Sequence, residues 1–204
     1  SAADGVRREM ADQADSLLDA VADSAATAGW KVRRVGSPED AADVVTEICI
    51  ATDATRVLRS DQDVFDAVPV DAALGAKGVT PGIATVGEAG ADIPSLKDVA
   101  FDSEIGITGV DYAIAETGTV VLHPRQGLSR LVSLAPGRHI AILNKGDVLP
   151  SLDELFTLER AGYQDGSLEG SMNLISGPSR TGDIAATIVD GIHGPFEVYL
   201  IIVG

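Results

Sequence analysis

The N-terminal segment carries apolar side chains at the period of an α-helix. From Val6 to Ala28 the apolar positions follow one another at spacings of 4, 4, 3, 4, 4 and 3 residues, which places them on one stripe of a helix. Aspartates fall largely off this stripe, and Gly29 ends the pattern. The sequence therefore predicts an N-terminal helix over residues 1–30 that packs on its own domain or on another subunit, and a domain over residues 31–204.

Beyond this helix, short apolar segments alternate with segments that begin at helix-capping residues. Ser37 and Ser151 are predicted N-caps, and Glu154 completes a capping box with Ser151. A bend is predicted at residues 117–118, within a hairpin. This alternation predicts an α/β fold, while residues 69–95 give no clear pattern. The predicted strands are 31–35, 56–59, 110–114, 119–123, 139–143, 174–176 and 197–203, and the later helices are 61–65, 128–134, 151–161 and 181–189.

Charge and composition narrow the classes of partner. The chain has 31 acidic and 15 basic residues, and its net charge of −16 disfavours binding to nucleic acid or to an anionic membrane. No run of 18 apolar residues occurs, so no membrane-spanning helix is expected. The chain shows no basic and apolar leader, and we expect a cytoplasmic protein. The single cysteine, Cys49, lies in an apolar stretch and cannot supply the thiolates of an iron–sulfur cluster, so we expect no cofactor on this chain.

The first segment with candidate chemistry is AETGT, residues 115–119, at the end of a predicted strand. Glu116 is placed to act as a general base or a nucleophile. Gly118 permits close approach of a ligand to the backbone, and the hydroxyl groups of Thr117 and Thr119 can bind an oxyanion. The alternative is structural: Glu116 pairs with a nearby arginine, and the threonines stabilise the turn.

The second segment, residues 176–184, follows a predicted strand and begins a predicted helix. Free backbone N–H groups there, with Ser179, Arg180, Thr181 and Asp183, would form a cradle for an anion. Arg180 would clamp a carboxylate or phosphate through two hydrogen bonds. The segment is not a P-loop. A well-capped helix with Arg180 in a structural ion pair fits the same residues.

The third segment is the turn at residues 191–195, where glycines on both sides would expose the imidazole of His193 as an acid or base. A lone histidine in a loop is also commonly structural. Arg130 is a further candidate for the same pocket, although a solvated or paired arginine is the simpler interpretation. The spacing of His123, His139 and His193 matches no metal motif, and we expect no metal site.

Taken in order, three segments resemble the LUD domain family: ITGVDYAIAETGT at 107–119, GPSRTGDI at 177–184 and GIHGP at 191–195. The resemblance implies a mostly parallel central sheet with helices on both faces, similar to the fold of sugar-phosphate isomerases and CoA transferases. It also implies a role beside iron–sulfur oxidoreductase subunits that oxidise L-lactate to pyruvate. The chain departs from the family pattern at Ala185, where a glutamate is expected.

We therefore expect an accessory subunit of L-lactate utilisation that binds a small carboxylate ligand or an electron-transfer partner. Glu116, Thr117, Arg180, Thr181 and His193 would line one pocket at the carboxyl ends of the strands, the usual ligand position in such sheets. Two alternatives stay open. One is an independent enzyme, similar to CoA transferases, that uses Glu116 as its nucleophile. The other is a purely structural scaffold that holds partner proteins together.

Overall fold

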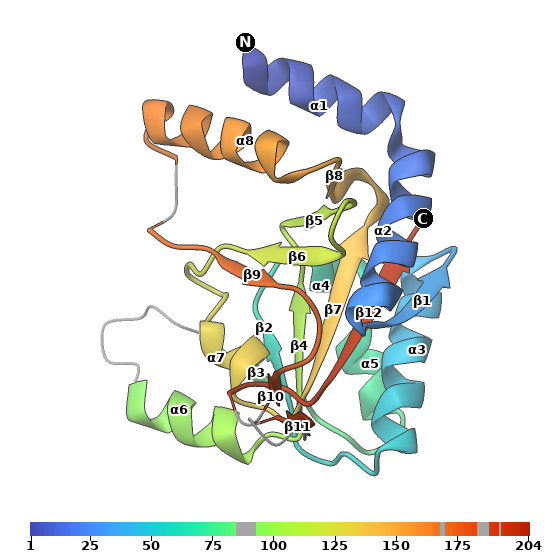
Figure 1. Ribbon diagram of the computed structural model, residues 1–204. Helices are drawn as coiled ribbons and strands as arrows, with labels where there is room; N and C mark the ends of the chain where they lie inside the picture. Colours follow the sequence, from blue (N-terminus) through green and yellow to red (C-terminus); the bar gives the residue numbers. More distant parts are fainter. Residues whose placement is uncertain (85–92, 168–169, 183–187, 192) are drawn as a thin grey trace.

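The computed structural model describes residues 1–84, 93–167, 170–182, 188–191 and 193–204. Helices and strands alternate along most of the chain and form layers (Figure 1). The elements in chain order are α1 (Ala2–Asp12), α2 (Ala14–Ala28), β1 (Lys31–Val35), α3 (Pro38–Ala51), β2 (Val57–Ser60), α4 (Val64–Ala67), α5 (Val70–Gly75), β3 (Gly82–Ala84), α6 (Ile93–Asp102), β4 (Ile105–Gly109), β5 (Tyr112–Ile114), β6 (Thr119–Leu122), α7 (Arg130–Leu134), β7 (Arg138–Asn144), the 3₁₀ turn η1 (Lys145–Asp147), β8 (Val148–Leu149), α8 (Leu152–Asp165), β9 (Asn173–Ile175), β10 (Arg180–Gly182), β11 (Ile188–Asp190) and β12 (Glu197–Val203).

A six-stranded sheet with the order β1-β12-β7-β4-β2-β3 forms the centre of the molecule. All of its neighbouring strands run parallel. The inner strands β7 and β12 are almost entirely buried, as expected for strands covered on both faces. The predicted α/β fold with a mostly parallel central sheet is therefore confirmed.

Helices cover both faces of this sheet, because alternate side chains of a strand point to opposite faces. α3 and α5 pack on the face that presents Ile107, Ile140 and Ile201. α2 packs on the other face, which presents Leu143 and Leu200. Farther along this second face, α6 and α7 cover β2 and β3.

A smaller sheet, with the order β8-β5-β6-β9, stands beyond the carboxyl ends of β4 and β7 (Figure 1). β4 leads into β5 through residues 110–111, and β7 leads into β8 through η1. α1 and α8 cover this sheet, and their Met10 and Leu155 pack against Ile114 and Val121. The small sheet therefore stands over the loops that leave the central strands.

The N-terminal helical segment is confirmed, but it consists of two helices. The chain leaves helical geometry at Gln13, with φ −109° and ψ 12°. α1 then packs beside α8, whereas α2 packs on the central sheet (Figure 1). The predicted hairpin around residues 117–118 and the capping box of Ser151 and Glu154 are both confirmed.

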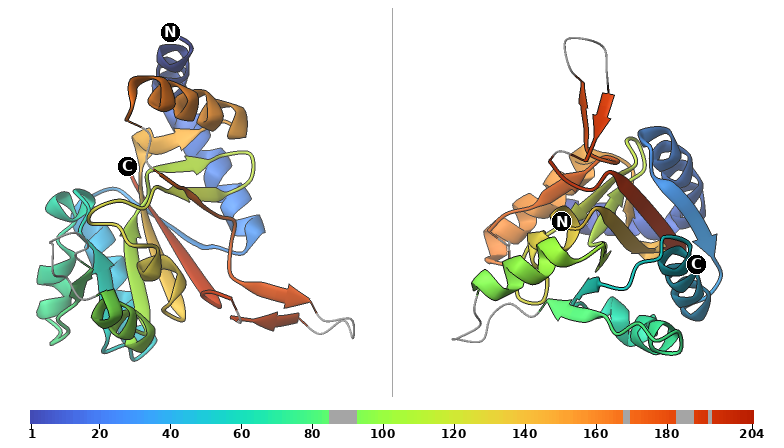
Figure 2. Two further views of the ribbon diagram at one scale, coloured as in Figure 1. Left: turned by 90° about the vertical axis from the view of Figure 1, so that its left-hand side faces the viewer. Right: turned by 90° about the horizontal axis from the view of Figure 1, so that it is seen from below.

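The predicted helix over residues 181–189 is wrong. Residues 180–182 and 188–190 form the antiparallel strands β10 and β11, and this pair extends away from the rest of the chain (Figure 2). β-branched residues such as Thr181 and Val189 favour strands, and this preference outweighs the capping pattern that precedes them. Because no helix begins here, the helix-start amides expected to bind an anion are not formed by the described residues.

Candidate functional site

The first predicted segment forms the turn between β5 and β6, against α2. Ser24 Oγ of α2 donates a hydrogen bond to the carbonyl oxygen of Ala115 at 2.6 Å. Gly118 has φ 65°, and a Cβ atom there would overlap the backbone of Ala25. Gly118 thus allows the turn to pack directly on α2. The side chain of Glu116, in the same turn, is exposed.

A short chain of hydroxyl groups joins this turn to the second predicted segment. Thr117 Oγ1 lies 2.8 Å from Thr119 Oγ1, which in turn lies 2.7 Å from Ser176 Oγ. β6 and β9 pair immediately beside these residues, with Val120 opposite Ile175. The hydroxyl groups therefore continue the sheet pairing, and the structure brings the first two segments side by side.

Ser179 connects the second segment with the third. Its backbone N donates to the carbonyl oxygen of Pro195 at 2.8 Å, and its Oγ accepts from the backbone N of His193 at 3.3 Å. Phe196, which follows Pro195, donates from its backbone N to the carbonyl oxygen of Gly137 at 3.0 Å. Gly137 directly precedes β7, and Phe196 directly precedes β12. The third segment therefore lies at the amino ends of these strands, and its expected place at the carboxyl ends is wrong.

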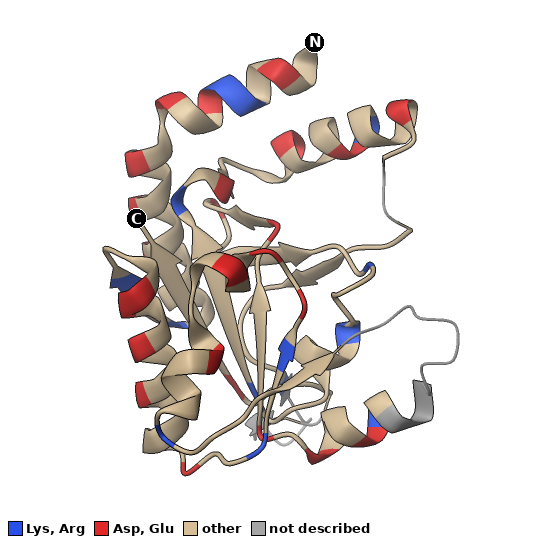
Figure 3. Cartoon of the chain, turned by 180° about the vertical axis from the view of Figure 1, so that it is seen from behind, with Lys and Arg blue, Asp and Glu red and all other residues tan. Residues whose placement is uncertain are grey.

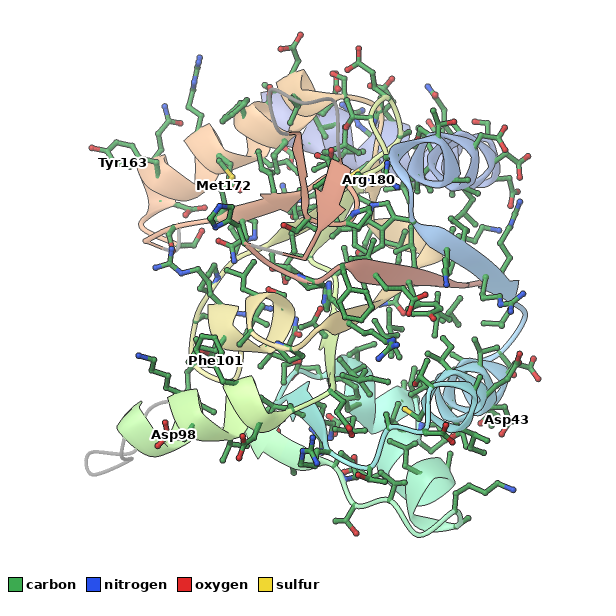
Figure 4. All side chains as sticks on the ribbon, turned by 60° about the horizontal axis from the view of Figure 1, so that its bottom comes forward. Asp43, Asp98, Phe101, Tyr163, Met172 and Arg180 are labelled. Carbon is green, nitrogen blue, oxygen red and sulfur yellow. The ribbon has the colours of Figure 1, made fainter. Side chains whose placement is uncertain are left out.

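The side chains predicted to share a pocket are mostly exposed. Arg180 lies where β10 leaves the body of the chain, beside Gly29 at the end of α2 (Figure 4). Asp183 and the side chain of Thr181 lie outside the described residues. A single pocket built from the three segments stays a prediction. The exposed members of the set are Glu116, Thr117, Arg130, Arg180 and His193.

A different polar cluster occupies the point where β4 ends and the small sheet begins. Asp111 accepts hydrogen bonds from Arg125 through both carboxylate oxygens, at 2.7 and 3.0 Å. The same carboxylate accepts from the backbone N of His123 at 2.6 Å and lies 3.2 Å from its Nδ1. On the other side of the ring, His123 Nε2 lies 2.9 Å from Glu159 of α8. Three elements therefore meet in one charged network.

This network shifts the protonation of its members. Burial raises the pKa of Asp111, but hydrogen bonds from His123 and Arg125 outweigh burial and hold that pKa below its ordinary value. The hydrogen bond to Asp111 raises the pKa of His123, burial opposes this, and the charge of Glu159 adds to the rise. The arrangement therefore favours a carboxylate at Asp111 and an imidazolium at His123.

A cavity of about 210 Å³, which we call the strand-end cavity, lies directly beside Asp111. Its walls include the last residues of β4 and β7 and the residues that follow β2 and β4, so it occupies the position where parallel α/β sheets usually bind ligands. Acidic residues are spread over the helices (Figure 3), but Arg125 is among the residues that line this cavity. The lining residues are Asp61, Gln62, Asp63, Val64, Gly109, Val110, Asp111, Arg125, Gln126 and Asn144.

Gln62 is held firmly in the wall of the strand-end cavity. Its Oε1 accepts from Ser60 Oγ at 2.6 Å and from the backbone N of Gly109 at 2.9 Å. These two bonds fix the amide group, so that Nε2 is its donor atom. A fixed amide donor and a guanidinium on one cavity are groups that bind a carboxylate.

A second cavity, of about 310 Å³, lies on the other side of Asp111 and Arg125, and we call it the helix-side cavity. Arg7 of α1, Tyr112 of β5 and Glu159 of α8 contribute to its lining. Asp111 and Arg125 line both cavities, so their ion pair forms a shared wall.

Sequence reasoning considered His123 only as a metal ligand and passed over Asp111 and Arg125. The signal was nonetheless present, because Asp111 lies two residues after β4, and His123 and Arg125 lie one and three residues after β6. The antiparallel pairing of β5 with β6, rather than spacing along the chain, brings Asp111 beside the residues that follow β6. Within the described ranges, no group of three His, Cys, Asp or Glu side chains is arranged to hold a metal ion. Over the same ranges, no helix has the length and apolar character needed to cross a membrane.

Comparison with known proteins gives one family match. Residues 18–203 match the LUD domain. A solved structure, described as a DUF162 family protein from Deinococcus radiodurans, superposes with a TM-score of 0.61 at 22% identity and covers 94% of this chain and 98% of that one. At this identity the likeness shows a shared fold.

Curated relatives carry the name Lactate utilization protein C. The protein of Exiguobacterium sp. is 38% identical over 111 residues, which is 52% of this chain and 47% of the relative. The protein of Halalkalibacterium halodurans is 39% identical over 109 residues, 53% of this chain and 47% of the relative. That of Bacillus subtilis is 35% identical over 105 residues, 51% and 44%. The chain thus spans about half the length of the curated relatives it matches.

Proposed function

This chain belongs to the LUD domain family, and we propose that it takes part in lactate utilisation by binding L-lactate, a small 2-hydroxy acid, in the strand-end cavity. The names of the relatives support the pathway. The strand-end cavity, with Arg125 and Gln62 beside carboxylate side chains, is the observation that carries the proposal. Its volume of about 210 Å³ lies below that of pockets for drug-sized ligands and suits a smaller molecule.

The polar groups of the cavity match both ends of a hydroxy acid. Arg125 and the amide of Gln62 are donors for the ligand carboxylate. Asp61 and Asp63 are acceptors, and both are exposed at the cavity rim, where they would accept a hydrogen bond from the 2-hydroxyl group. A keto oxygen donates no hydrogen bond and would meet these carboxylates unfavourably. L-Lactate is therefore expected to bind more tightly than pyruvate, by about tenfold or more.

The electron-accepting step belongs, in this proposal, to iron–sulfur partner proteins. Cys49 is the only cysteine of the chain and is buried, so the chain supplies no thiolate set for a cluster of the ordinary kind. The exposed residues Glu116, Arg180 and His193 then serve as a surface that a partner contacts. Their exposure supports this role.

Titration calorimetry with L-lactate and pyruvate tests the proposal. Arg125→Met is expected to weaken lactate binding by about ten- to a hundredfold, because a charge-assisted hydrogen bond contributes about 1.5–3 kcal/mol. Arg125→Lys retains the charge but not the two-pronged geometry, and an intermediate affinity is expected. Circular dichroism of each variant checks that the fold persists.

Arg180→Ala is the matched control, because Arg180 belongs to the alternative anion site and does not line the strand-end cavity. Its lactate affinity is expected to equal that of the unmodified protein. Loss of binding in Arg180→Ala with unchanged binding in Arg125→Met would place the ligand at the second and third segments instead. Absence of lactate binding in the unmodified protein would leave the role of a scaffold.

A further inference from the structure

In the shared wall between the two cavities, Arg125 and His123 both form hydrogen bonds with the carboxylate of Asp111. Asp111 Oδ2 accepts from the backbone N of His123 and from Arg125, and it faces His123 Nδ1 at 3.2 Å. Asp111 Oδ1 accepts from Arg125 at 2.7 Å. The negative charge of Asp111 is therefore divided between a permanent cation, Arg125, and a histidine whose charge depends on pH.

The side chain of His123 is largely buried, so its charge interacts strongly with neighbouring groups. Its side chain has a relative exposure of 11%, and the ring of Tyr112 packs edge-on at 6.4 Å. Charged groups from several of the described elements lie around it. Asp111 and Glu159 contact its two nitrogens, and Arg125 donates to its carbonyl oxygen at 2.8 Å. Arg7 of α1 and Asp165 of α8 face it across the helix-side cavity.

The two carboxylates in direct contact dominate this set. Each accepts a hydrogen bond from one ring nitrogen only when the ring carries both protons, so the imidazolium satisfies both at once. A neutral ring donates to one carboxylate and leaves the other facing a lone pair. Protonation of His123 consequently strengthens its electrostatic interaction with Asp111 and weakens the interaction between Asp111 and Arg125.

We infer that His123 is a positioning residue that sets the carboxylate affinity of the strand-end cavity, because its imidazolium form offsets the negative charge of Asp111 in the wall of that cavity. This inference rests on the proposed binding of L-lactate in that cavity. When the ring loses its proton, His123 no longer offsets the negative charge of Asp111, and the cavity attracts an anion less strongly. Affinity for L-lactate therefore falls as the pH rises through the pKa of His123.

The direction of the pH dependence is fixed by linkage. The hydrogen bond to Asp111 raises the pKa of free His123, and an anion on Arg125 raises it further. Because the two binding equilibria are linked, a ligand that raises the pKa of His123 also binds more tightly at pH values where His123 is protonated. Each pKa unit of that further rise corresponds to a change in affinity of about tenfold between the acidic and the alkaline limit.

The test is calorimetric titration of the full chain with L-lactate from about pH 6 to about pH 9, beside an NMR titration of the His123 ring in the free protein. Affinity is expected to fall with a midpoint at the pKa measured by NMR. Glu159→Gln removes a negative charge from the ring, and both midpoints are expected to move together to lower pH. His193→Gln, at an exposed histidine, is expected to leave the profile unchanged.

His123→Gln keeps a hydrogen-bonding side chain without a titrating group, and its lactate affinity is expected to be low and independent of pH. A structural role alone would lower affinity or stability without moving any midpoint. Lactate binding of equal strength at every pH, or a profile that persists in His123→Gln, would overturn the inference while the proposed function stands. Absence of binding at every pH would overturn the proposed function and, with it, the inference.

Discussion

Acidification is expected to destabilise this fold through His139, a residue far from the surface. His139 of β7 has no exposed area, and its Nε2 lies 2.8 Å from Thr108 Oγ1 of β4. Its Nδ1 has no hydrogen-bond partner among the described residues, and the ring of Trp30 packs beside it at 6.2 Å. Burial lowers the pKa of His139 from 6.5 to about 3, because removal from water disfavours the charged imidazole.

The size of the effect follows from that shift. Between 6.5 and about 3 the unfolded chain binds a proton at His139 and the folded chain does not, so the free energy of unfolding decreases as the pH falls. At about 1.4 kcal/mol per pH unit, the whole interval amounts to about 5 kcal/mol at most, and about 2 kcal/mol falls between pH 6 and pH 4.5. A domain with a total stability of about 5–15 kcal/mol would lose a large part of it.

Urea unfolding at a series of pH values measures this directly. The matched variant is His139→Leu/Thr108→Val, because replacing both hydrogen-bonding partners with apolar groups of similar shape is nearly neutral at pH 7. The other titrating groups are common to both proteins, so the difference in pH dependence isolates His139. If the variant loses as much stability between pH 6 and pH 4.5 as the unmodified protein, the buried neutral histidine is not the cause, and the reasoning fails.

Two further outcomes follow from packing and burial. Gly106→Ala is expected to destabilise the protein by roughly 3–5 kcal/mol, because a Cβ atom on β4 would overlap the carbonyl oxygen of Val132 in α7. Gly5→Ala in α1 is expected to stabilise the protein by about 0.5–1 kcal/mol, because a Cβ atom there would have no neighbouring atom within 4 Å. Thermal unfolding of both variants checks the contrast. Burial raises the pKa of the Cys49 thiol to about 11, so a thiol reagent at neutral pH is expected to react with it only after unfolding, and rapid labelling of the folded protein would contradict this.

Local patterns predicted much of the fold because burial and capping act over short stretches of chain. The buried run of β12, the capping box at Ser151 and the turn containing Gly118 all follow from neighbouring residues. The break between α1 and α2 at Gln13 could not be predicted from neighbouring residues, because one apolar stripe continues through two helices that pack on different partners. The sequence predicts a helix where residues 180–182 and 188–190 form strands, because a capping pattern and β-branched residues compete there, and the pairing of the strands decides.

The candidate site was harder to predict, because residues far apart in the sequence build it. Asp111, His123 and Glu159 meet only after β5, β6 and α8 have packed together. The motifs favoured glycine-rich turns, but the candidate side chains of those turns are mostly exposed, and the turns are joined mainly by backbone and hydroxyl hydrogen bonds. The proposed site therefore draws on residues that follow buried strands rather than on the turns.

A crystal structure of the protein grown with L-lactate tests the central claim most directly. We expect density for the ligand in the strand-end cavity, with its carboxylate beside Arg125 and Gln62 and its hydroxyl group toward Asp61 and Asp63. Ligand density beside Arg180 and His193, with an empty strand-end cavity, would contradict it.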